Sequence, residues 1–237
     1  MADSGNFRGA LRRRGAYVLG VTSDLTAQGA HRLREADTGA SLQGDRWVEW
    51  SFCFARMAEG PGRTLDYGAD IGFLSLAAAQ RGHDVVALDR LPSALDYDHP
   101  KVRHVQADVL THDFGGERFD QIVNCSSVEH VGLGGRYGSF GDEDGDLKAM
   151  EAMSRVLAEG GRMILTIPVG EDLVAAPQHR IYGPERLPRL LEHYDIAEQQ
   201  FWRKDGAHWR QCERADALAT EGSASFYSLG LFVLTGR

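Results

Sequence analysis

Acidic residues stand at the ends of three successive predicted strands in the first half of the chain. They are Asp66, Asp89 and Asp108, and they end or closely follow the apolar segments 63–66, 84–89 and 102–106. A carboxylate in such a position can accept two hydrogen bonds from a ribose diol, or one from an adenine amino group. Each residue alone could instead be a helix cap or a surface acid. Three in succession favour a binding site for a nucleoside-type cofactor.

A glycine-bearing turn follows the first of these strands. It reads D-Y-G-A-D-I-G over residues 66–72. Gly68 permits a tight turn and lets a ligand approach the backbone, and Gly72 lets the following helix pack closely on the sheet. The spacing is G-x-x-x-G, whereas a pyrophosphate cradle has G-x-G-x-x-G, so a dinucleotide is disfavoured. The alternative is a turn that serves packing only.

Strands and helices alternate along the chain from residue 45 onward. Apolar segments predict strands at 63–66, 84–89, 102–106, 119–125, 162–168, 195–202 and 225–234. Helical spacing predicts helices from Asp45, which would cap the first, and over 73–80, 146–158 and 184–194. This order predicts an α/β fold with a doubly wound, mostly parallel seven-stranded sheet and a terminal antiparallel β-hairpin, its last strand at the sheet edge. Ligands of such sheets bind outside the carboxyl ends of the strands.

The composition limits the class of protein. A chain of 237 residues suffices for one α/β domain, here predicted over 46–237, with an extension or lid at 1–45. The net charge of −8 argues against a nucleic-acid partner, and we expect the one basic run, 12–14, to be solvated. Only three of 26 basic residues are lysines, which suggests a GC-rich bacterial source. Three scattered cysteines give no zinc or disulfide pattern, and no long apolar segment indicates a membrane, so we expect a cytoplasmic protein.

A family resemblance is carried by five segments in order. They are D-Y-G-A-D-I-G, A-L-D-R, Q-A-D-V, F-D-Q-I-V and R-V-L-A-E-G-G-R-M-I-L-T-I-P-V. From about residue 63 to 170 the chain resembles the class I S-adenosylmethionine (SAM)-dependent methyltransferases, and 195–237 is similar to their final β-hairpin. More narrowly, S-S-V-E-H-V-G-L-G-G-R-Y-G with G-D-L-K-A-M resembles poorly characterised bacterial methyltransferase-like proteins, sometimes found beside sugar or secondary-metabolite genes. The resemblance implies a Rossmann-like methyltransferase fold with SAM as cofactor.

The resemblance also assigns residues to parts of SAM. It implies the methionine end at Asp66, Gly68, Ala69 and the turn glycine Gly72, the ribose at Asp89, the adenine at Asp108 and Val109 with Arg90 and Leu91 flanking it, and the sulfonium near Asn124 and Cys125. The chain departs from the family at Asp70, where a glycine is usual. An acid there narrows the turn, and it could repel the methionine carboxylate or bind the ammonium group.

Candidate catalytic residues follow the fourth and fifth predicted strands. Methyl transfer from a sulfonium needs mainly alignment and exclusion of water, but a hydroxyl acceptor also benefits from a base. Glu129 and His130, with Tyr137 beyond them, follow the fourth strand, and histidine titrates near neutral pH. His179 follows the fifth, beside Arg180 and Tyr182. The alternatives are a histidine that holds its loop, for His130, and a surface loop, for His179.

Two further groups of residues have a functional and a structural interpretation. Asp142, Glu143, Asp144 and Asp146 suggest a divalent cation, but their spacing does not match a calcium loop, and acids suit a helix N-terminus. We therefore predict no metal. The aromatic residues Trp47, Trp50, Phe52 and Phe54 could face the acceptor or the sulfonium, and Trp202 and Trp209, beside His208, are similar; core packing is the alternative.

Together these patterns predict a SAM-dependent methyltransferase. The acceptor is expected to be a small molecule, and the resemblance suggests a hydroxyl of a sugar or natural product. N-methylation of a small molecule is the nearest alternative. An NAD-dependent oxidoreductase on a Rossmann-like sheet and a non-catalytic SAM-binding protein are two further alternatives.

Overall fold

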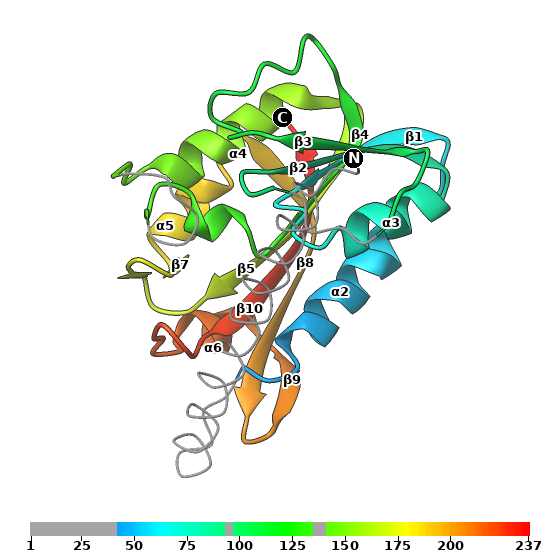
Figure 1. The fold of residues 1–237 in the computed structure, drawn as a ribbon. Helices are drawn as coiled ribbons and strands as arrows, with labels where there is room; N and C mark the ends of the chain where they lie inside the picture. Colours follow the sequence, from blue (N-terminus) through cyan, green and yellow to red (C-terminus); the bar gives the residue numbers. More distant parts are fainter. Residues whose placement is uncertain (1–41, 93–96, 135–140) are drawn as a thin grey trace, which may run out of the picture. The chain divides into compact units, whose positions relative to one another are not determined.

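The computed structural model describes residues 42–92, 97–134 and 141–237 (Figure 1). Almost all of the predicted extension, with the basic run 12–14, lies outside these ranges, as does Tyr137. Within them, no helix is both long enough and apolar enough to cross a bilayer. The extension and the basic run therefore stay predictions.

The central sheet has eight strands in the described ranges, in the order β3-β2-β1-β4-β5-β10-β8-β9. Their bounds are β1 Gly62–Tyr67, β2 His83–Asp89, β3 Val102–Gln106, β4 Phe119–Cys125, β5 Leu157–Val169, β8 Tyr194–Asp205, β9 His208–Cys212 and β10 Ser228–Gly236. Neighbours among β1 to β5 pair in parallel, whereas β10 is antiparallel to both β5 and β8. The mostly parallel sheet with a terminal antiparallel pair is as predicted.

The prediction differs from the sheet in two places. Strand β9 is an eighth strand that returns along β8, and its residues are half-buried or exposed, so no apolar pattern marks it. Strand β10 lies between β5 and β8 rather than at the edge. Its residues are buried from Ser228 to Leu234, as a strand covered on both faces requires.

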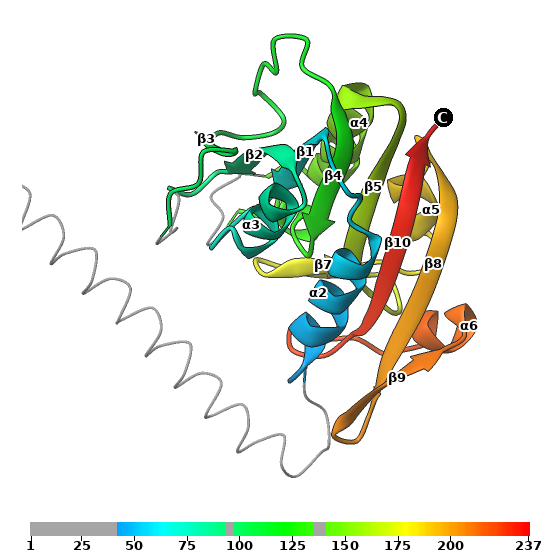
Figure 2. The same cartoon turned by 90° about the vertical axis from the view of Figure 1, so that its right-hand side faces the viewer.

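Helices cover both faces of the sheet (Figures 1 and 2). The helices are α2 Asp45–Arg56, α3 Phe73–Gln80, α4 Gly145–Val156, α5 Arg186–Leu190 and α6 Arg214–Leu218, with a 3₁₀ turn, η1, at Val128–His130. Helices α2 and α3 pack on one face through one apolar cluster, and α4, α5 and α6 pack on the other through a second cluster. The fold is therefore doubly wound, as predicted.

Some element boundaries differ from those predicted. The helix predicted over 184–194 is limited to α5, and β8 already begins at Tyr194. Helix α4 ends at Val156, and the following Gly-containing segment belongs to β5, where its pairing with β4 is irregular. Gly44, rather than Asp45, is the N-cap of α2. A separate two-stranded sheet, β6 Leu173–Ala175 with β7 His179–Ile181, follows β5.

Candidate functional site

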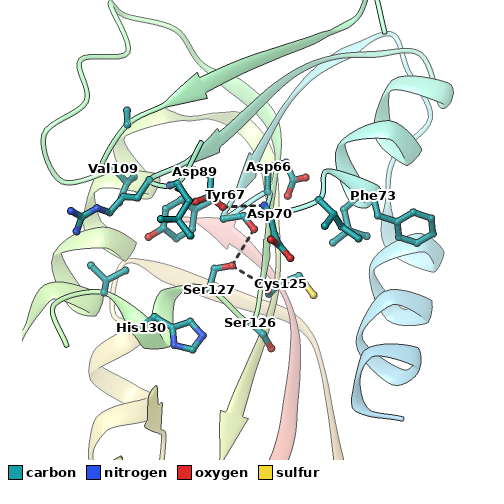
Figure 3. Close-up of a pocket in the computed structure, with 18 of the residues that line it drawn as sticks. Asp66, Tyr67, Asp70, Phe73, Asp89, Val109, Cys125, Ser126, Ser127 and His130 are labelled. Carbon is teal, nitrogen blue, oxygen red and sulfur yellow. Dashed lines mark hydrogen bonds between the residues drawn. The ribbon is translucent and has the colours of Figure 1, made fainter. Parts of the chain in front are cut away.

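A cavity of about 270 Å³ opens at the carboxyl ends of the first four strands (Figure 3). It lies where the strand order reverses between β1 and β4, the position at which doubly wound sheets bind ligands. Nine of the eleven predicted cofactor residues line it: Asp66, Gly68, Ala69, Asp89, Arg90, Leu91, Asp108, Val109 and Cys125. Asp70 lines it as well. The chain thus brings the three acidic strand ends to one cavity.

The turn after β1 is pressed against the segment after β4. Gly68 has φ 70°, and its amide donates a hydrogen bond to the carbonyl of Leu88 at 2.9 Å. A Cβ atom on Gly68 would lie 2.1 Å from Ser127 Oγ, so a side chain has no room there. The turn therefore needs glycine both for its dihedral angle and for its close approach to Ser127.

Asp66 is a buried carboxyl group at the floor of this cavity. It is 2% exposed, and Ser75 Oγ donates a hydrogen bond of 2.5 Å to its Oδ2. Burial raises the pKa of Asp66 to about 6, against the opposing effect of the Ser75 hydrogen bonds, and the nearby Asp89 raises it further. The folded chain therefore holds a proton on Asp66 more tightly than the unfolded chain does.

This difference predicts a pH-dependent effect of the Asp66→Asn substitution. The contribution of Asp66 to wild-type stability should fall as pH rises from about 4 to about 6, because Asp66 ionises at lower pH in the unfolded chain. The variant has no such ionisation. Between these pH values, the free energy of unfolding of Asp66→Asn should rise by up to about 3 kcal/mol relative to that of wild type, as measured by urea unfolding. Asp84→Asn, at an exposed position of β2, is the control, and a pH-independent difference for Asp66→Asn would contradict the assignment.

The carboxylate of Asp89 accepts hydrogen bonds from two segments, the turn after β1 and the loop after β2. Its Oδ2 accepts a hydrogen bond from the amide of Asp70 at 3.0 Å (Figure 3). Its Oδ1 accepts one from the amide of Leu91 at 2.8 Å. Each carboxylate oxygen can accept more than one hydrogen bond, so both retain capacity for a diol. The backbone amides therefore orient the carboxylate at the cavity wall.

Asp108 and Arg90 face each other at the β3 end of the cavity. Arg90 Nη1 lies 3.6 Å from Asp108 Oδ2, while Asp108 Oδ1 accepts the amide of Leu110 at 3.0 Å. Val109, which lies between Asp108 and Leu110 in the loop after β3, is buried and contributes an apolar wall. This end of the cavity therefore combines an apolar wall with polar groups.

Two predicted cofactor residues do not line the cavity. Asn124 is buried on the opposite face of the sheet, where its Oδ1 accepts the amide of Val128 at 3.3 Å and its Nδ2 lies 3.9 Å from the sulfur of Met153. Successive residues of a strand point to opposite faces, so Cys125 faces the cavity and Asn124 does not. Gly72 has φ 68° and forms the N-cap of α3, a structural position.

His130 lines the cavity, and a backbone carbonyl holds its ring at Nδ1. Its Nδ1 lies 2.5 Å from the carbonyl oxygen of Gln178, which can only accept a hydrogen bond. Nδ1 therefore carries the proton, and the neutral ring has its lone pair on Nε2. This tautomer is the one that allows Nε2 to act as a base.

The other two predicted catalytic residues, Glu129 and His179, are not on the cavity wall. Glu129 is 2% exposed, and its Oε1 lies 3.7 Å from His130 Nε2. Burial raises the pKa of Glu129 to about 8. His179 is also buried, which lowers the pKa of its ring, and its ring centre lies 6.3 Å from that of His130. Both residues therefore lie next to His130 but do not line the cavity.

Helix α2 supplies a cavity residue, Arg46, that the sequence patterns did not single out. Arg46 lines the cavity and forms a 2.7 Å ion pair with the buried Glu49 one turn on. Glu49 also accepts hydrogen bonds from Thr166 Oγ1 at 2.8 Å and from Ser126 Oγ. The i, i+3 pairing of Arg46 and Glu49 was the available signal, but it does not say which way the helix faces.

The aromatic residues of α2 have different surroundings. Trp50 lines the cavity and packs on Phe73, with ring centres 4.8 Å apart. Phe52 is buried in the core, and Trp47 is 76% exposed. The other candidates, Phe54, Trp202, Trp209 and His208, do not line the cavity. Only Trp50 of this group is placed to touch a ligand in the cavity.

The acidic run before α4 forms ion pairs with basic side chains. Asp142 pairs with Lys148 at 2.7 Å, Asp144 with Arg186 at 3.4 Å, and Asp146 with Arg186 at 2.5 Å. Asp144 is the N-cap of α4, but its side chain makes no capping hydrogen bond. Among the described residues, no cluster of three or more His, Cys, Asp or Glu side chains could hold a metal ion. Electrostatic pairing, rather than capping, is the role of these acids.

Comparison with known proteins gives two sequence matches. A family model described as "Caenorhabditis protein of unknown function, DUF268" matches residues 99–209, less than half of the chain. The protein-L-isoaspartate O-methyltransferase of Dechloromonas aromatica (strain RCB) is 26% identical over an alignment that covers 62% of this chain and 67% of that protein.

Solved structures give a broader match. The 1,6-didemethyltoxoflavin-N1-methyltransferase of Burkholderia thailandensis, with bound 1,6-didemethyltoxoflavin and S-adenosylhomocysteine, has a TM-score of 0.52 at 18% identity over 94% of this chain and 90% of that chain. The N-methyltransferase NodS of Bradyrhizobium japonicum WM9, with S-adenosylhomocysteine, has 0.53 at 15% identity over 82% and 88%. A putative methyltransferase of Haloferax volcanii, in complex with the Trm112 activator, has 0.57 at 16% identity over 83% and 92%.

These structural matches establish the fold. The chain has the Rossmann-like fold of the class I SAM-dependent methyltransferases, so the fold implied by the sequence resemblance is confirmed.

Proposed function

We propose that this chain is a SAM-dependent methyltransferase. The observation that carries the proposal is that acidic residues from three successive strand ends line one cavity, together with the glycine turn after β1. The turn fits a cofactor that approaches the backbone, because Gly68 lines the cavity without a side chain. The presence of S-adenosylhomocysteine in two structures of the same fold supports the choice of cofactor.

The residues of the cavity suit the separate parts of SAM. Asp89 offers both carboxylate oxygens to a ribose diol, and Asp108 with Val109 offers a polar edge and an apolar wall to the adenine. Asp66, Gly68 and Ala69 stand at the methionine end, and Cys125 lies near the sulfonium. Arg46 adds a cation on the same cavity, which suits the carboxylate of the methionine moiety. When bound, SAM would supply a methyl group on an electron-poor sulfur.

We propose a hydroxyl of a small molecule, such as a sugar or natural product, as the methyl acceptor. The support is His130, whose Nδ1 is held by the carbonyl of Gln178 so that Nε2 can take the hydroxyl proton. The nearest alternative is an amine, since both solved neighbours with S-adenosylhomocysteine are named N-methyltransferases. His130→Ala should slow transfer to a hydroxyl by about 10²-fold or more, and an unchanged rate would favour the amine.

The test of the proposed function is SAM binding by the Asp89→Ala variant. Loss of a charged acceptor of two hydrogen bonds should raise the dissociation constant about 5- to 30-fold, equivalent to about 1–2 kcal/mol. Isothermal titration calorimetry with SAM measures this effect. Asp84→Ala, an exposed position of the same strand away from the cavity, should bind as wild type does.

The same titration tests the alternative cofactor. Wild-type protein that binds NAD but not SAM would support an oxidoreductase and overturn the proposal. An unchanged dissociation constant for Asp89→Ala would remove Asp89 from the site. Tight SAM binding without transfer to any acceptor in a broad panel would support a non-catalytic SAM-binding protein.

A further inference from the structure

A buried carboxyl group lies beside Nε2 of His130, a residue that lines the cavity. Glu129 is 2% exposed, and its Oε1 lies 3.7 Å from His130 Nε2. Its Oε2 has no hydrogen-bond partner among the residues that the structure describes. Buried polar atoms are nearly always paired, so an unpaired carboxyl oxygen beside a candidate base calls for a functional explanation.

The charged side chains around Glu129 form ion pairs with other residues. Arg46 is paired with Glu49, and Asp146 is paired with Arg186 and faces Arg180 at 3.6 Å. Glu49 and Asp146 disfavour a negative charge on Glu129, and Arg46 partly offsets them. The hydroxyls of Tyr67, Tyr182 and Tyr227 belong to buried neutral side chains on the surrounding elements. Glu129 is therefore poised to respond to any new positive charge in the cavity.

We propose that Glu129 receives, through His130, the proton that the acceptor hydroxyl loses during methyl transfer. This inference rests on the proposed function. The sulfur–methyl bond breaks and its electron pair stays on sulfur, while a bond forms between the acceptor oxygen and the methyl carbon. The hydroxyl proton passes to His130 Nε2. Once the acceptor oxygen carries the methyl group, this N–H turns to Glu129 Oε1, which faces the same nitrogen, and the proton moves to Oε1. The 3.7 Å separation is longer than a hydrogen bond, and such contacts in ligand-free sites commonly tighten in the complex.

The charge on sulfur explains why the proton stays on Glu129. The sulfonium of SAM is positive and favours the carboxylate form, whereas the thioether of S-adenosylhomocysteine is neutral and leaves the protonated form favoured. Methyl transfer thus removes the positive charge near Glu129 at the moment when a proton is released. The ionisation of Glu129 is expected to follow the charge of the bound sulfur.

Proton-linked calorimetry tests this coupling without knowledge of the acceptor. SAM and S-adenosylhomocysteine are each titrated at about pH 8 in two buffers of different ionisation enthalpy, which gives the number of protons exchanged on binding. Because the pKa of Glu129 is about 8, wild type should release about half a proton more with SAM than with S-adenosylhomocysteine. The Glu129→Gln variant should lose this excess. Glu159→Gln, at an exposed position, should keep it.

Comparison of both ligands in both proteins isolates the Glu129 contribution. The two ligands share the same amino-acid end, so any proton exchanged by Asp66 is the same for SAM and for S-adenosylhomocysteine. Any proton exchanged by the ligand amine is the same for wild type and for Glu129→Gln, so it cancels when the two proteins are compared. An infrared difference spectrum of wild type adds a readout that needs no variant: a protonated carboxyl band should be stronger with S-adenosylhomocysteine than with SAM.

The outcomes separate this inference from the proposed function. If wild type binds both ligands but the proton excess is absent, or persists in Glu129→Gln, the role of Glu129 is wrong while the proposed function stands. If the variant does not fold, an unchanged carboxyl band between the two wild-type complexes overturns the role. If wild type binds neither ligand, the proposed function itself fails.

Discussion

Replacement of Gly68 with alanine is expected to weaken SAM binding by about 100-fold or more, equivalent to about 2.7 kcal/mol. The new Cβ atom would lie 2.1 Å from Ser127 Oγ and 2.5 Å from Ser127 Cβ, so the turn or the segment after β4 must move. At φ 70°, an alanine also adds backbone strain of about 1–2 kcal/mol. Both changes displace the backbone that the cofactor is expected to contact. Calorimetric titration with SAM measures the loss, and circular dichroism verifies the fold.

Gly115→Ala is the matched control for backbone strain. Gly115 has φ 58°, but a Cβ atom there would meet nothing within 4 Å. This variant should lose a similar backbone contribution to stability and keep wild-type SAM affinity. The double variant Gly68→Ala/Ser127→Gly removes the two atoms that clash and should recover part of the affinity. Wild-type affinity in Gly68→Ala alone would show that the turn does not contact SAM.

The sheet and the cofactor end of the cavity could be predicted because local patterns determine them. Buried parallel strands read as short apolar runs, and the residue that ends each run lies at the same edge of the sheet. Asp66, Asp89 and Asp108 line one cavity for this reason. Gly68 was predictable for a similar reason, since only glycine permits both the dihedral angle and the close approach.

The remaining part of the site depends on contacts between segments distant in sequence. Arg46 reaches the cavity because α2 packs across the sheet, and no local pattern fixes that direction. Asn124 and His179 do not line the cavity, because the direction of each side chain is not fixed by its position in the sequence. The register of a strand decides this for Asn124, and the packing of the β6–β7 hairpin decides it for His179. His130 and Glu129 both follow the fourth strand, but of the two only His130 lines the cavity.

The position of β10 shows the same limit at the level of the fold. Its apolar run predicted a strand, but an edge strand and a central strand cannot be separated until the neighbours are known. Pairing with β5 on one side and β8 on the other buries the run on both faces. The apolar composition of this run was the available signal for a central position, because an edge strand with such a run would favour aggregation.

Removal of the Asp146 carboxylate is expected to lower the free energy of unfolding by about 3–5 kcal/mol. Asp146 is fully buried, and it accepts hydrogen bonds from Arg186 Nη2 at 2.5 Å, Arg186 Nε at 2.9 Å and the hydroxyl of Tyr182 at 3.1 Å. It also faces Arg180, which is 1% exposed. The Asp146→Ala variant would leave these donors in a buried site without their anion. Urea unfolding measures the change in free energy.

The same substitution should also disturb the segment that carries His130. Arg180 Nη1 donates a hydrogen bond of 2.5 Å to the carbonyl of Val131, and Nη2 donates one of 3.2 Å to the carbonyl of Asp142. An arginine that has lost its counter-charge is expected to move toward water, which would release these carbonyls. We therefore expect slower methyl transfer in Asp146→Ala under conditions in which the variant remains folded.

Glu151→Ala is the matched control on the same helix. Glu151 pairs with Arg155 on the exposed side of α4, and such surface pairs contribute less than about 1 kcal/mol. A large difference between the two variants would show that burial of the partners, rather than loss of an acid from α4, determines the effect. Loss of less than about 1 kcal/mol in Asp146→Ala would contradict a stabilising role for the network, and the position of His130 would then depend on the backbone of the segment itself.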